Sequence, residues 1–511
     1  MGYNRPAMPK PYDFGSVELD IAPQERRAAV AVDPESSFRM LVMGDFSGRA
    51  NRGIVEKVAG RRPVAVDREN IDGLLSRMRA ALEIPLAGGG NLRLEFRELE
   101  DFHPDRIFTQ NQIFRALKET REDLEDPRTY QATAAKLRPV EPPPPPPRPD
   151  DAVADVLSGS LLDQVLEQAD TGKSAAPVRT ADPLASYVRS IVAPHVVPKP
   201  DARQPELVAQ VDKAIGGAMG AILHHPDFQA LEAAWRGLDF MARGLETDTQ
   251  LRLYVLDVSL AELAADFGSA DDLSATGIYK LLVGQTVETP GAAPWTVLAG
   301  NYTFDDGLVN VEMLCRIALI ASKTGAPFLA AADSKILGCK SFGATPDPDE
   351  WAKTSEETWS FVRAFPEARY LGLAAPRFLL RLPYGKQTSP AETFPFEEMP
   401  DPPVHESYLW GNPIFVCMML IGQAFSEYGW DMRPGMVAEI GGLPVHVYKD
   451  KDGDPQMKAC AEALLTQRAA ERMLEKGLIP IVSFKSQDKI RVAGFQSVAK
   501  PHKPLAGRWG R

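Results

Sequence analysis

The apolar residues of this chain fall into short continuous runs that alternate with longer stretches of helical period. Four runs have the length and composition of buried strands. A strand buried on both faces and followed by a helix is typical of a parallel sheet that helices cover. The pattern therefore predicts an α/β fold, with buried strands at Phe38–Gly44, Leu251–Val258, Trp295–Gly300 and Pro327–Ala332.

Residues 31–138 predict a small α/β region that continues beyond the first of these strands. A helix is expected from Asn70, as its N-cap, through Leu82. Leu92–Leu99 alternates apolar and polar residues, which is typical of a half-exposed strand, and Ile107–Leu124 has the period of an amphipathic helix.

Six consecutive prolines, Pro142–Pro147, divide the chain. Proline fixes φ near about −65° and has no N–H donor, so this run cannot join a helix or an inner strand and forms a stiff spacer. We therefore expect a flexible N-terminal arm, a small domain, a proline-rich linker with a short amphipathic helix at 160–169, and a larger α/β region. The expected bounds are 1–30, 31–138, 139–180 and 181–511.

Composition narrows the function classes. A hydrophobic content of 44% and a charged content of 25% are ordinary for a soluble globular protein, and the net charge of −12 argues against nucleic-acid binding. The four cysteines have no C-x-x-C spacing, so we expect reduced, structural thiols and a cytoplasmic protein. Residues 1–15 lack the apolar core of a signal peptide, and the longest apolar stretch, Ile414–Gly422, is too short to cross a bilayer.

Three motifs could suggest a metal, nucleotide or carboxylate site. The adjacent His224 and His225 precede a proline at a helix end, where neighbouring side chains point apart. Gly44–Gly48 follows a strand but lacks a glycine-rich nucleotide motif, so we expect a turn that needs glycine backbone angles. Asp305 and Asp306 precede a glycine and indicate a turn or helix start. We therefore expect no catalytic, cofactor-binding or metal-binding residues.

One charged cluster could belong to an enzyme. Arg377 and Arg381 stand near Glu397 and Glu398, and two arginines can clamp an anion. No histidine, nucleophile or glycine-rich loop accompanies them in the sequence. We therefore expect structural ion pairs at this cluster.

Two short segments outside the domains have the pattern of docking elements. Val17–Ile21 alternates like a strand, and a strand on an arm can add to a neighbour's sheet. Ser160–Gln168 has the period of an amphipathic helix, which could dock on a partner or pack on its own domain. The residues concerned are Val17, Leu19 and Ile21 in the strand and Leu161, Leu162, Val165 and Leu166 in the helix.

Several blocks of the sequence resemble the contractile sheath of the type VI secretion system. Blocks in the first region are similar to the small sheath subunit, TssB or VipA: FRMLVMGDFSG (38–48), VAVDREN (64–70) and LRLEFRELEDFHPDRI (92–107). Blocks in the second region resemble the large subunit, TssC or VipB: HHPDFQALEAAWRGL (224–238), WTVLAGNYTF (295–304), ARYLGLAAPRFLLRLPYG (368–385), YLWGNP (408–413) and GFQSVAKP (494–501). The resemblance covers residues 17–135 and 160–503.

The resemblance implies a fusion of two sheath subunits that are usually separate chains. It implies a structural protomer without enzymatic activity or cofactor, which polymerises with copies of itself around an Hcp-like inner tube and contracts to propel it. The implied location is the bacterial cytoplasm, on a membrane-anchored baseplate, without insertion of this chain into the membrane. Further implied partners are baseplate components and a ClpV-like AAA+ unfoldase, which would contact Leu161, Leu162, Val165 and Leu166.

In the family the large subunit continues past the GFQSVAKP block into a segment that supplies strands to an inter-subunit sheet. The sequence ends at Arg511, so we expect that segment to be absent and either another chain to supply it or Val17–Ile21 to pair elsewhere. Two alternatives stay open. One is a sheath relative that does not polymerise and acts as a baseplate adaptor or cap. The other is a cytoplasmic α/β enzyme that uses Arg377 and Arg381 on an anionic substrate.

Overall fold

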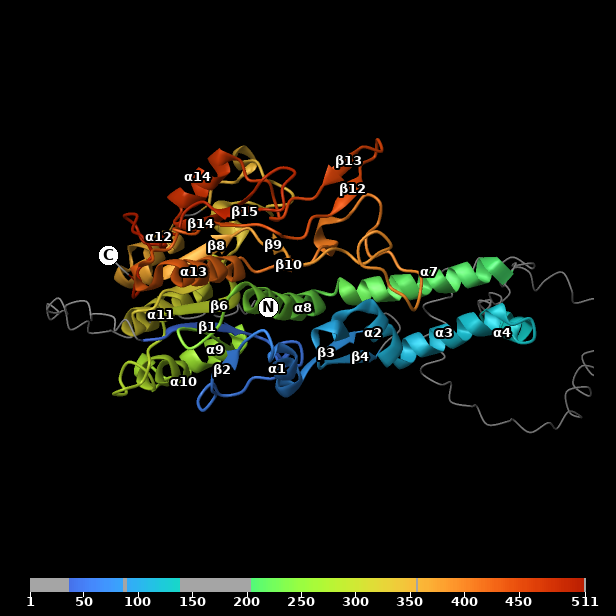
Figure 1. The fold of residues 1–511 in the computed structure, drawn as a ribbon, viewed down its shortest axis with the longest axis horizontal. Helices are drawn as coiled ribbons and strands as arrows, with labels where there is room; N and C mark the ends of the chain where they lie inside the picture. Colours follow the sequence, from blue (N-terminus) through green and yellow to red (C-terminus); the bar gives the residue numbers. More distant parts are fainter. Residues whose placement is uncertain (1–35, 86–89, 138–203, 355–356, 510–511) are drawn as a thin grey trace, which may run out of the picture.

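The structure is a computed structural model, and it describes residues 36–85, 90–137, 204–354 and 357–509. A nine-stranded sheet forms its centre (Figure 1). In spatial order its strands are β11 (Glu439–Ile440), β15 (Ile490–Val492), β14 (Leu478–Ser483), β8 (Leu371–Ala375), β7 (Phe328–Ala332), β6 (Val297–Phe304), β1 (Phe38–Gly44), β5 (Leu251–Asp257) and β2 (Val64–Val66). The six strands from β14 to β5 are parallel, and antiparallel pairs close the edges. The predicted α/β fold is confirmed.

Strand β1 comes from the first region of the sequence but lies in the middle of the sheet, between β5 and β6 (Figure 1). Val42 pairs with Val255 on one side and with Ala299 on the other. Every residue of β1 except Arg39 is buried, and a strand covered on both faces needs such an apolar sequence. The two sequence regions therefore share one core. The domain bounds expected from the sequence, 1–30, 31–138, 139–180 and 181–511, stay a prediction.

Helices cover both faces of the sheet. Met40 and Val42 of β1 belong to one apolar cluster, whereas Leu41 and Met43 belong to a second. Because successive strand residues point to opposite faces, the two clusters lie on opposite sides of the sheet. The first includes residues of α8 (Pro226–Gly244) and α13 (Ile414–Tyr428), and the second residues of α9 (Leu260–Phe267), α10 (Gly277–Tyr279), α11 (Leu308–Thr324), α12 (Glu357–Ala364) and α14 (Gln467–Glu475).

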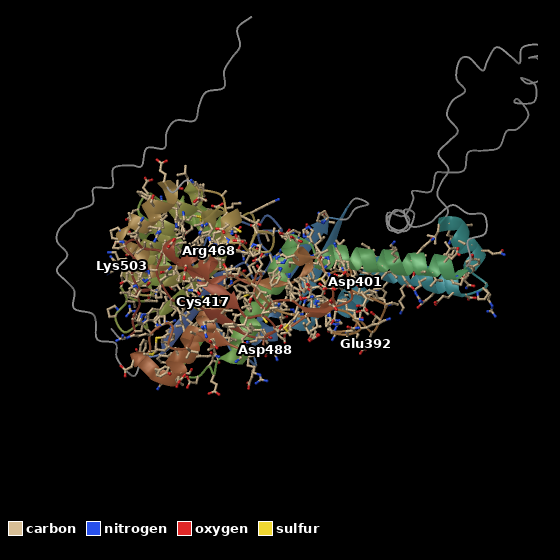
Figure 2. The ribbon with its side chains drawn as sticks, turned by 90° about the horizontal axis from the view of Figure 1, so that it is seen from above. Glu392, Asp401, Cys417, Arg468, Asp488 and Lys503 are labelled. Carbon is tan, nitrogen blue, oxygen red and sulfur yellow. The ribbon has the colours of Figure 1, made fainter. Side chains whose placement is uncertain are left out.

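A helical arm projects from this body in both views (Figures 1 and 2). It consists of α3 (Gln112–Glu125), α4 (Tyr130–Leu137) and the outer part of α7 (Gln204–Leu223). The arm again joins the two regions, because Arg121 of α3 pairs with Asp212 of α7 at 2.6 Å, from Nε to Oδ1. The side-chain amide of Gln204 also donates to the carbonyl oxygen of Leu124 at 2.7 Å.

The helix expected from Asn70 through Leu82 is shorter than predicted. Helix α1 (Ile71–Met78) ends where Arg79 takes the left-handed conformation, with φ 53° and ψ 49°. Residues from Ala80 onward form β3 (Ala80–Pro85), which pairs antiparallel with β4 (Asn91–Phe96). The apolar residues Ala80, Leu82 and Ile84 gain burial as a strand face, so tertiary pairing overrides local helix propensity.

The helix expected at Ile107–Leu124 is broken at Asn111. Helix α2 (Pro104–Gln110) ends there, and the extended Asn111, with φ −99° and ψ 134°, caps α3 by accepting the Ile113 N–H at 3.0 Å. The half-exposed strand is confirmed from Leu92 to Phe96, because β4 buries Leu92, Leu94 and Phe96 on one face. Leu99, where the strand was expected to end, begins a 3-10 helix instead.

Two further strand pairs lie outside the main sheet: β9 (Phe378–Leu379) with β10 (Trp410–Gly411), and β12 (Val447–Lys449) with β13 (Pro455–Met457). The β12–β13 hairpin extends away from the body in Figure 1. Within the described ranges, no helix combines the length and apolar character needed to cross a membrane.

Candidate functional site

The residues predicted to dock partners lie outside the described part of the chain. They are Val17, Leu19 and Ile21 of the expected N-terminal arm and Leu161, Leu162, Val165 and Leu166 of the expected linker helix. Their roles stay predictions. The polar site that the structure does describe lies where the two regions meet.

This site, which we call the joint, lies at the carboxyl end of the parallel sheet. Strands β1 and β5 end side by side, with Gly44 opposite Asp257. The Asp257 carboxylate accepts the backbone N–H of Phe46 at 2.9 Å and of Ser47 at 3.2 Å, and the Ser47 hydroxyl at 2.7 Å. The joint consists of Asp45, Ser47, Arg49, Arg61, Asp257 and Glu262.

In the joint, the Asp257 carboxylate occupies the position that a phosphate would take in a nucleotide-binding loop. Consecutive backbone N–H groups after a strand can hold an anion, but those of Phe46 and Ser47 already donate to Asp257. Gly48 has φ +73°, and a Cβ there would collide with the carbonyl oxygen of Ala81. The predicted glycine-dependent turn is confirmed.

Glu262 is the buried centre of the joint. It lies in the first turn of α9, where it accepts the Ser259 N–H at 3.0 Å in a capping box, and it also accepts the Glu56 N–H at 2.9 Å. Its carboxylate pairs with Arg61 at 2.6 Å and Arg49 at 3.1 Å. Burial alone would raise the pKa of Glu262, but these hydrogen bonds and the charge of Arg61 outweigh it and hold the pKa at about 2.

The pKa of Asp257 shifts in the opposite direction from that of Glu262. Burial raises its pKa, and the hydrogen bonds from Ser47 and Phe46 and the charge of Arg49 only partly oppose this. Two carboxylates thus face two guanidinium groups, since Arg49 also lies 3.2 Å from Asp257. These ion pairs join Arg49 and Arg61 of the first region to Asp257 and Glu262 of the second, so the arrangement can hold the loop after β1 against the second region.

Other contacts extend this attachment. The indole N–H of Trp235 donates to the Phe46 carbonyl oxygen at 2.7 Å. At the base of the arm, Asp105 of α2 accepts the Thr393 hydroxyl at 2.6 Å and the Glu392 N–H at 3.0 Å. Figure 2 labels Glu392 at this end of the molecule. Burial of Asp105 acts to raise its pKa, but these hydrogen bonds outweigh it and lower the pKa.

The Arg381 cluster forms a second buried ion network. Arg381, whose side chain is 9% exposed, pairs with Glu232 and Glu398 at 2.7 Å each, and both carboxylates are almost fully buried. Arg236 also pairs with Glu232 at 2.7 Å, and it donates to the Tyr384 hydroxyl at 3.0 Å. The expected structural ion pairing is confirmed for Arg381.

Arg377 also forms an ion pair, but with a different partner from the ones expected. It reaches Glu462 at 2.6 Å and keeps 49% of its side chain exposed. An anion clamp would need both arginines to face one cavity. A described cavity lies elsewhere, beneath α9 and α11, and its lining is apolar, including Met43, Phe267 and Ile317.

The histidines and cysteines have structural surroundings. His225 caps α8, because its Nδ1 accepts the Asp227 N–H at 3.3 Å. Within the described residues no three acidic, histidine or cysteine side chains converge on a metal position. All four cysteines are free thiols, and burial raises the pKa of Cys417 to about 12.

Sequence patterns did not identify the joint. Ser259 and Glu262 have capping-box spacing, which predicts a helix start but not the two arginines that Glu262 binds. Arg49 and Asp257 are 208 residues apart, so only the pairing of β1 with β5 brings them together.

Comparisons with known proteins agree with this two-region architecture. The model of the VipB family (EvpB/VC_A0108, tail sheath N-terminal domain) matches residues 205–499, more than half of the chain. The model of the T6SS VipA family (type VI secretion system, VipA, VC_A0107 or Hcp2) matches residues 19–140. The type VI secretion system sheath protein TssC1 of Pseudomonas aeruginosa is 35% identical over 306 residues, which are 58% of this chain and 61% of that protein.

The chain therefore spans less than two thirds of that relative's length. Both family matches occur in one polypeptide, in the order that the sequence blocks indicate. The chain belongs to the type VI secretion sheath family and carries a small-subunit, VipA-type region and a large-subunit, VipB-type region in fusion.

Proposed function

We propose that this chain is a structural protomer of a type VI secretion sheath, which polymerises with copies of itself around an Hcp-like inner tube and contracts to propel it. The observation that carries the proposal is the position of β1 between β5 and β6. This arrangement makes the VipA-type and VipB-type regions one folded unit. The regions 31–138 and 181–511 are then two parts of one protomer.

Contraction places a mechanical demand on such a unit. Subunits of a contracting lattice move as rigid bodies, and the free energy comes from the change in their contacts. A protomer whose two regions came apart could not transmit this free energy as motion of one rigid body. The shared sheet, the joint and the Arg381 cluster each hold the regions or their layers together.

Open sheet edges give a route to polymerisation. Within the described residues, β2 is hydrogen-bonded to a strand on one side only, as is β11 at the opposite edge. Unpaired edges accept an added strand from another chain. The strand of Val17, Leu19 and Ile21 from a neighbouring copy is the proposed occupant.

The remaining roles follow from the family. The protomer works in the bacterial cytoplasm on a membrane-anchored baseplate, binds baseplate components, and is not an enzyme. A ClpV-like AAA+ unfoldase recognises the helix with Leu161, Leu162, Val165 and Leu166 after contraction. Replacing Leu162 and Val165 with aspartate should abolish unfoldase binding while tubules still form.

Electron microscopy of the purified chain, alone and with Hcp-like rings, tests the proposal. Tubules or stacked rings are expected, and a triple variant with aspartate at Val17, Leu19 and Ile21 should remain folded but fail to form them. The matched control places aspartate at the exposed apolar residues Val55, Leu308 and Val309. A folded chain that stays monomeric under every condition, with tube protein present, would refute the proposal.

A further inference from the structure

A lysine and a histidine meet where the β12–β13 hairpin joins the body. The Nζ atom of Lys458, just after β13, lies 3.0 Å from Nδ1 of His405. The other ring nitrogen of His405, Nε2, lies 3.4 Å from Oε1 of Glu462. Gly343 packs against the imidazole, because a Cβ at Gly343 would collide with the ring. Lys458 and His405 are both half-buried.

These contacts define which nitrogen of His405 carries the proton. A carboxylate can only accept, so Nε2 must be protonated to bind Glu462. Nδ1 is then the basic nitrogen, and it faces the lysine amine. The order of groups is that of an activated nucleophile, with a base beside the nucleophile and a carboxylate that orients the base.

The pair can hold only one positive charge at low cost. If both Lys458 and His405 were cationic, two like charges would stand 3.0 Å apart in a half-buried place. Glu462 offsets this repulsion only in part, because Arg377 also pairs with it at 2.6 Å. Glu406 attracts the lysine charge, and the rings of Tyr408 and Trp410 lie 5.1 and 5.6 Å from Nζ.

The other histidine at this place, His446, already has a hydrogen-bond partner. Nδ1 of His446 lies 2.7 Å from the hydroxyl of Tyr408, so this histidine contacts the phenol that supports the lysine. We propose that Lys458 is a reactive lysine, which small acyl phosphates acylate with His405 as the base.

Acylation of Lys458 begins with a proton transfer to His405. His405 takes a proton from the Lys458 ammonium, and the free amine attacks the carbonyl carbon of the acyl phosphate. A C–N amide bond forms and the bond from the acyl carbon to the phosphate oxygen breaks. Inorganic phosphate leaves, and the second amine proton passes to solvent. Burial also lowers the pKa of Lys458, against the opposing charges of Glu462 and Glu406.

Acylation has a structural consequence. The amide is neutral, so it loses the ion–ring contacts to Tyr408 and Trp410 and presents one donor in place of three. An isolated two-stranded hairpin is marginally stable, so β12–β13 depends on such attachments. Acylated Lys458 therefore loosens the hairpin from the β10 segment.

Competitive labelling with acetyl phosphate tests the proposal on the full chain before any assembly. The chain is treated with limiting reagent from pH 6 to 11, and acetylation is measured for each lysine by peptide mass spectrometry. Lys449 and Lys451, exposed in the same hairpin, are the internal controls. Lys458 is expected to react at least about tenfold faster than either at pH 7.5, because a general base positioned at 3.0 Å typically accelerates such a step by about 10²–10⁴-fold.

Two variants locate the cause. His405→Gln keeps a polar side chain but cannot take the proton, and should reduce the Lys458 rate to that of the controls. Lys458→Arg should remove the labelled peptide and leave Lys449 and Lys451 unchanged. Equal rates for all three lysines at every pH in the unmodified chain would overturn the proposal, as would full preference for Lys458 in a folded His405→Gln variant. The readout does not depend on whether the chain forms tubules.

Discussion

The carboxylate of Asp257 accepts the backbone N–H of Phe46 at 2.9 Å, across 211 residues of sequence. Phe46 belongs to the VipA-type region and Asp257 to the VipB-type region. Since β1 and β5 are parallel neighbours, the contact forms at the end where both strands leave the sheet. The two regions are therefore attached to each other by contacts inside the fold, independently of the proline-rich linker.

Removing this carboxylate should weaken the whole unit. Asp257→Ala leaves the N–H groups of Phe46 and Ser47 without their acceptor, and buried unpaired donors cost about 1–3 kcal/mol each. We expect a clear fall of the urea unfolding midpoint. The control Asp239→Ala breaks a partly exposed pair with Arg243, worth at most about 1 kcal/mol. Equal midpoints for the two variants would contradict this role of Asp257.

The turn after β1 should tolerate no side chain at Gly48. Gly48→Ala combines a strained positive φ with a collision against Ala81, and should destabilise the protein by more than about 1–3 kcal/mol. Gly53 has a similar φ of +65° but open space around its Cβ position. Gly53→Ala should therefore cost only the backbone strain. If thermal melts show no difference between the variants, the close approach of Gly48 and Ala81 is wrong.

The Arg381 cluster should be sensitive to loss of its cation. Arg381→Met leaves Glu232 and Glu398 buried without their main partner, which costs about 3–5 kcal/mol. Arg93→Met is the control, because Arg93 and Glu95 pair with side chains 61% and 54% exposed. That pair should contribute below about 1 kcal/mol. Denaturant midpoints measure both, and an Arg381 variant as stable as the control would count against a structural role.

Acid should destabilise the protein through its buried carboxylates. Glu262, Glu398 and Glu462 each have a folded-state pKa of about 2, below the ordinary value of 4.5. As pH falls, the unfolded chain binds protons first, so stability is full above about pH 5 and declines toward pH 2. Urea midpoints at pH 7, 4.5 and 3 should show this fall.

One variant separates this effect from a general acid response. Glu398→Gln should be less stable at pH 7 but lose less stability between pH 4.5 and 3, because one of the titrating groups is gone. Glu95→Gln, at an exposed pair, should follow the unmodified chain. Parallel curves for all three proteins would show that Glu398 does not carry the acid response.

The buried strands were predictable from sequence because their apolar runs admit few other structures. Phe38–Gly44 matches β1 at both ends, and Leu251–Val258 differs from β5 by one residue. Position was not predictable: an apolar run does not reveal that β1 lies between two strands more than 200 residues away. The helix predicted through Leu82 failed for the same reason, since its partner strand β4 decides its structure.

The candidate site shows the same limit. The ion pairing of Arg381 was predicted from the carboxylates near it in sequence, and Glu398 is one of its partners. Glu232, its second partner, is 149 residues away, and Arg377 binds Glu462 at a separation of 85 residues. Charge pairs across such distances depend on the topology of the sheet and not on local pattern.

The VipA-type and VipB-type regions share one sheet, and we propose that they fold as one unit, which is the unit that assembles. Expressing residues 1–140 and 141–511 as separate chains tests it directly, with circular dichroism and gel filtration as readouts. We expect 141–511 alone to lack a cooperative unfolding transition, because β1 is missing between β5 and β6. Co-expression should restore a folded one-to-one complex. A 141–511 fragment that folds alone with the stability of the full chain would show that the two regions do not fold as one unit.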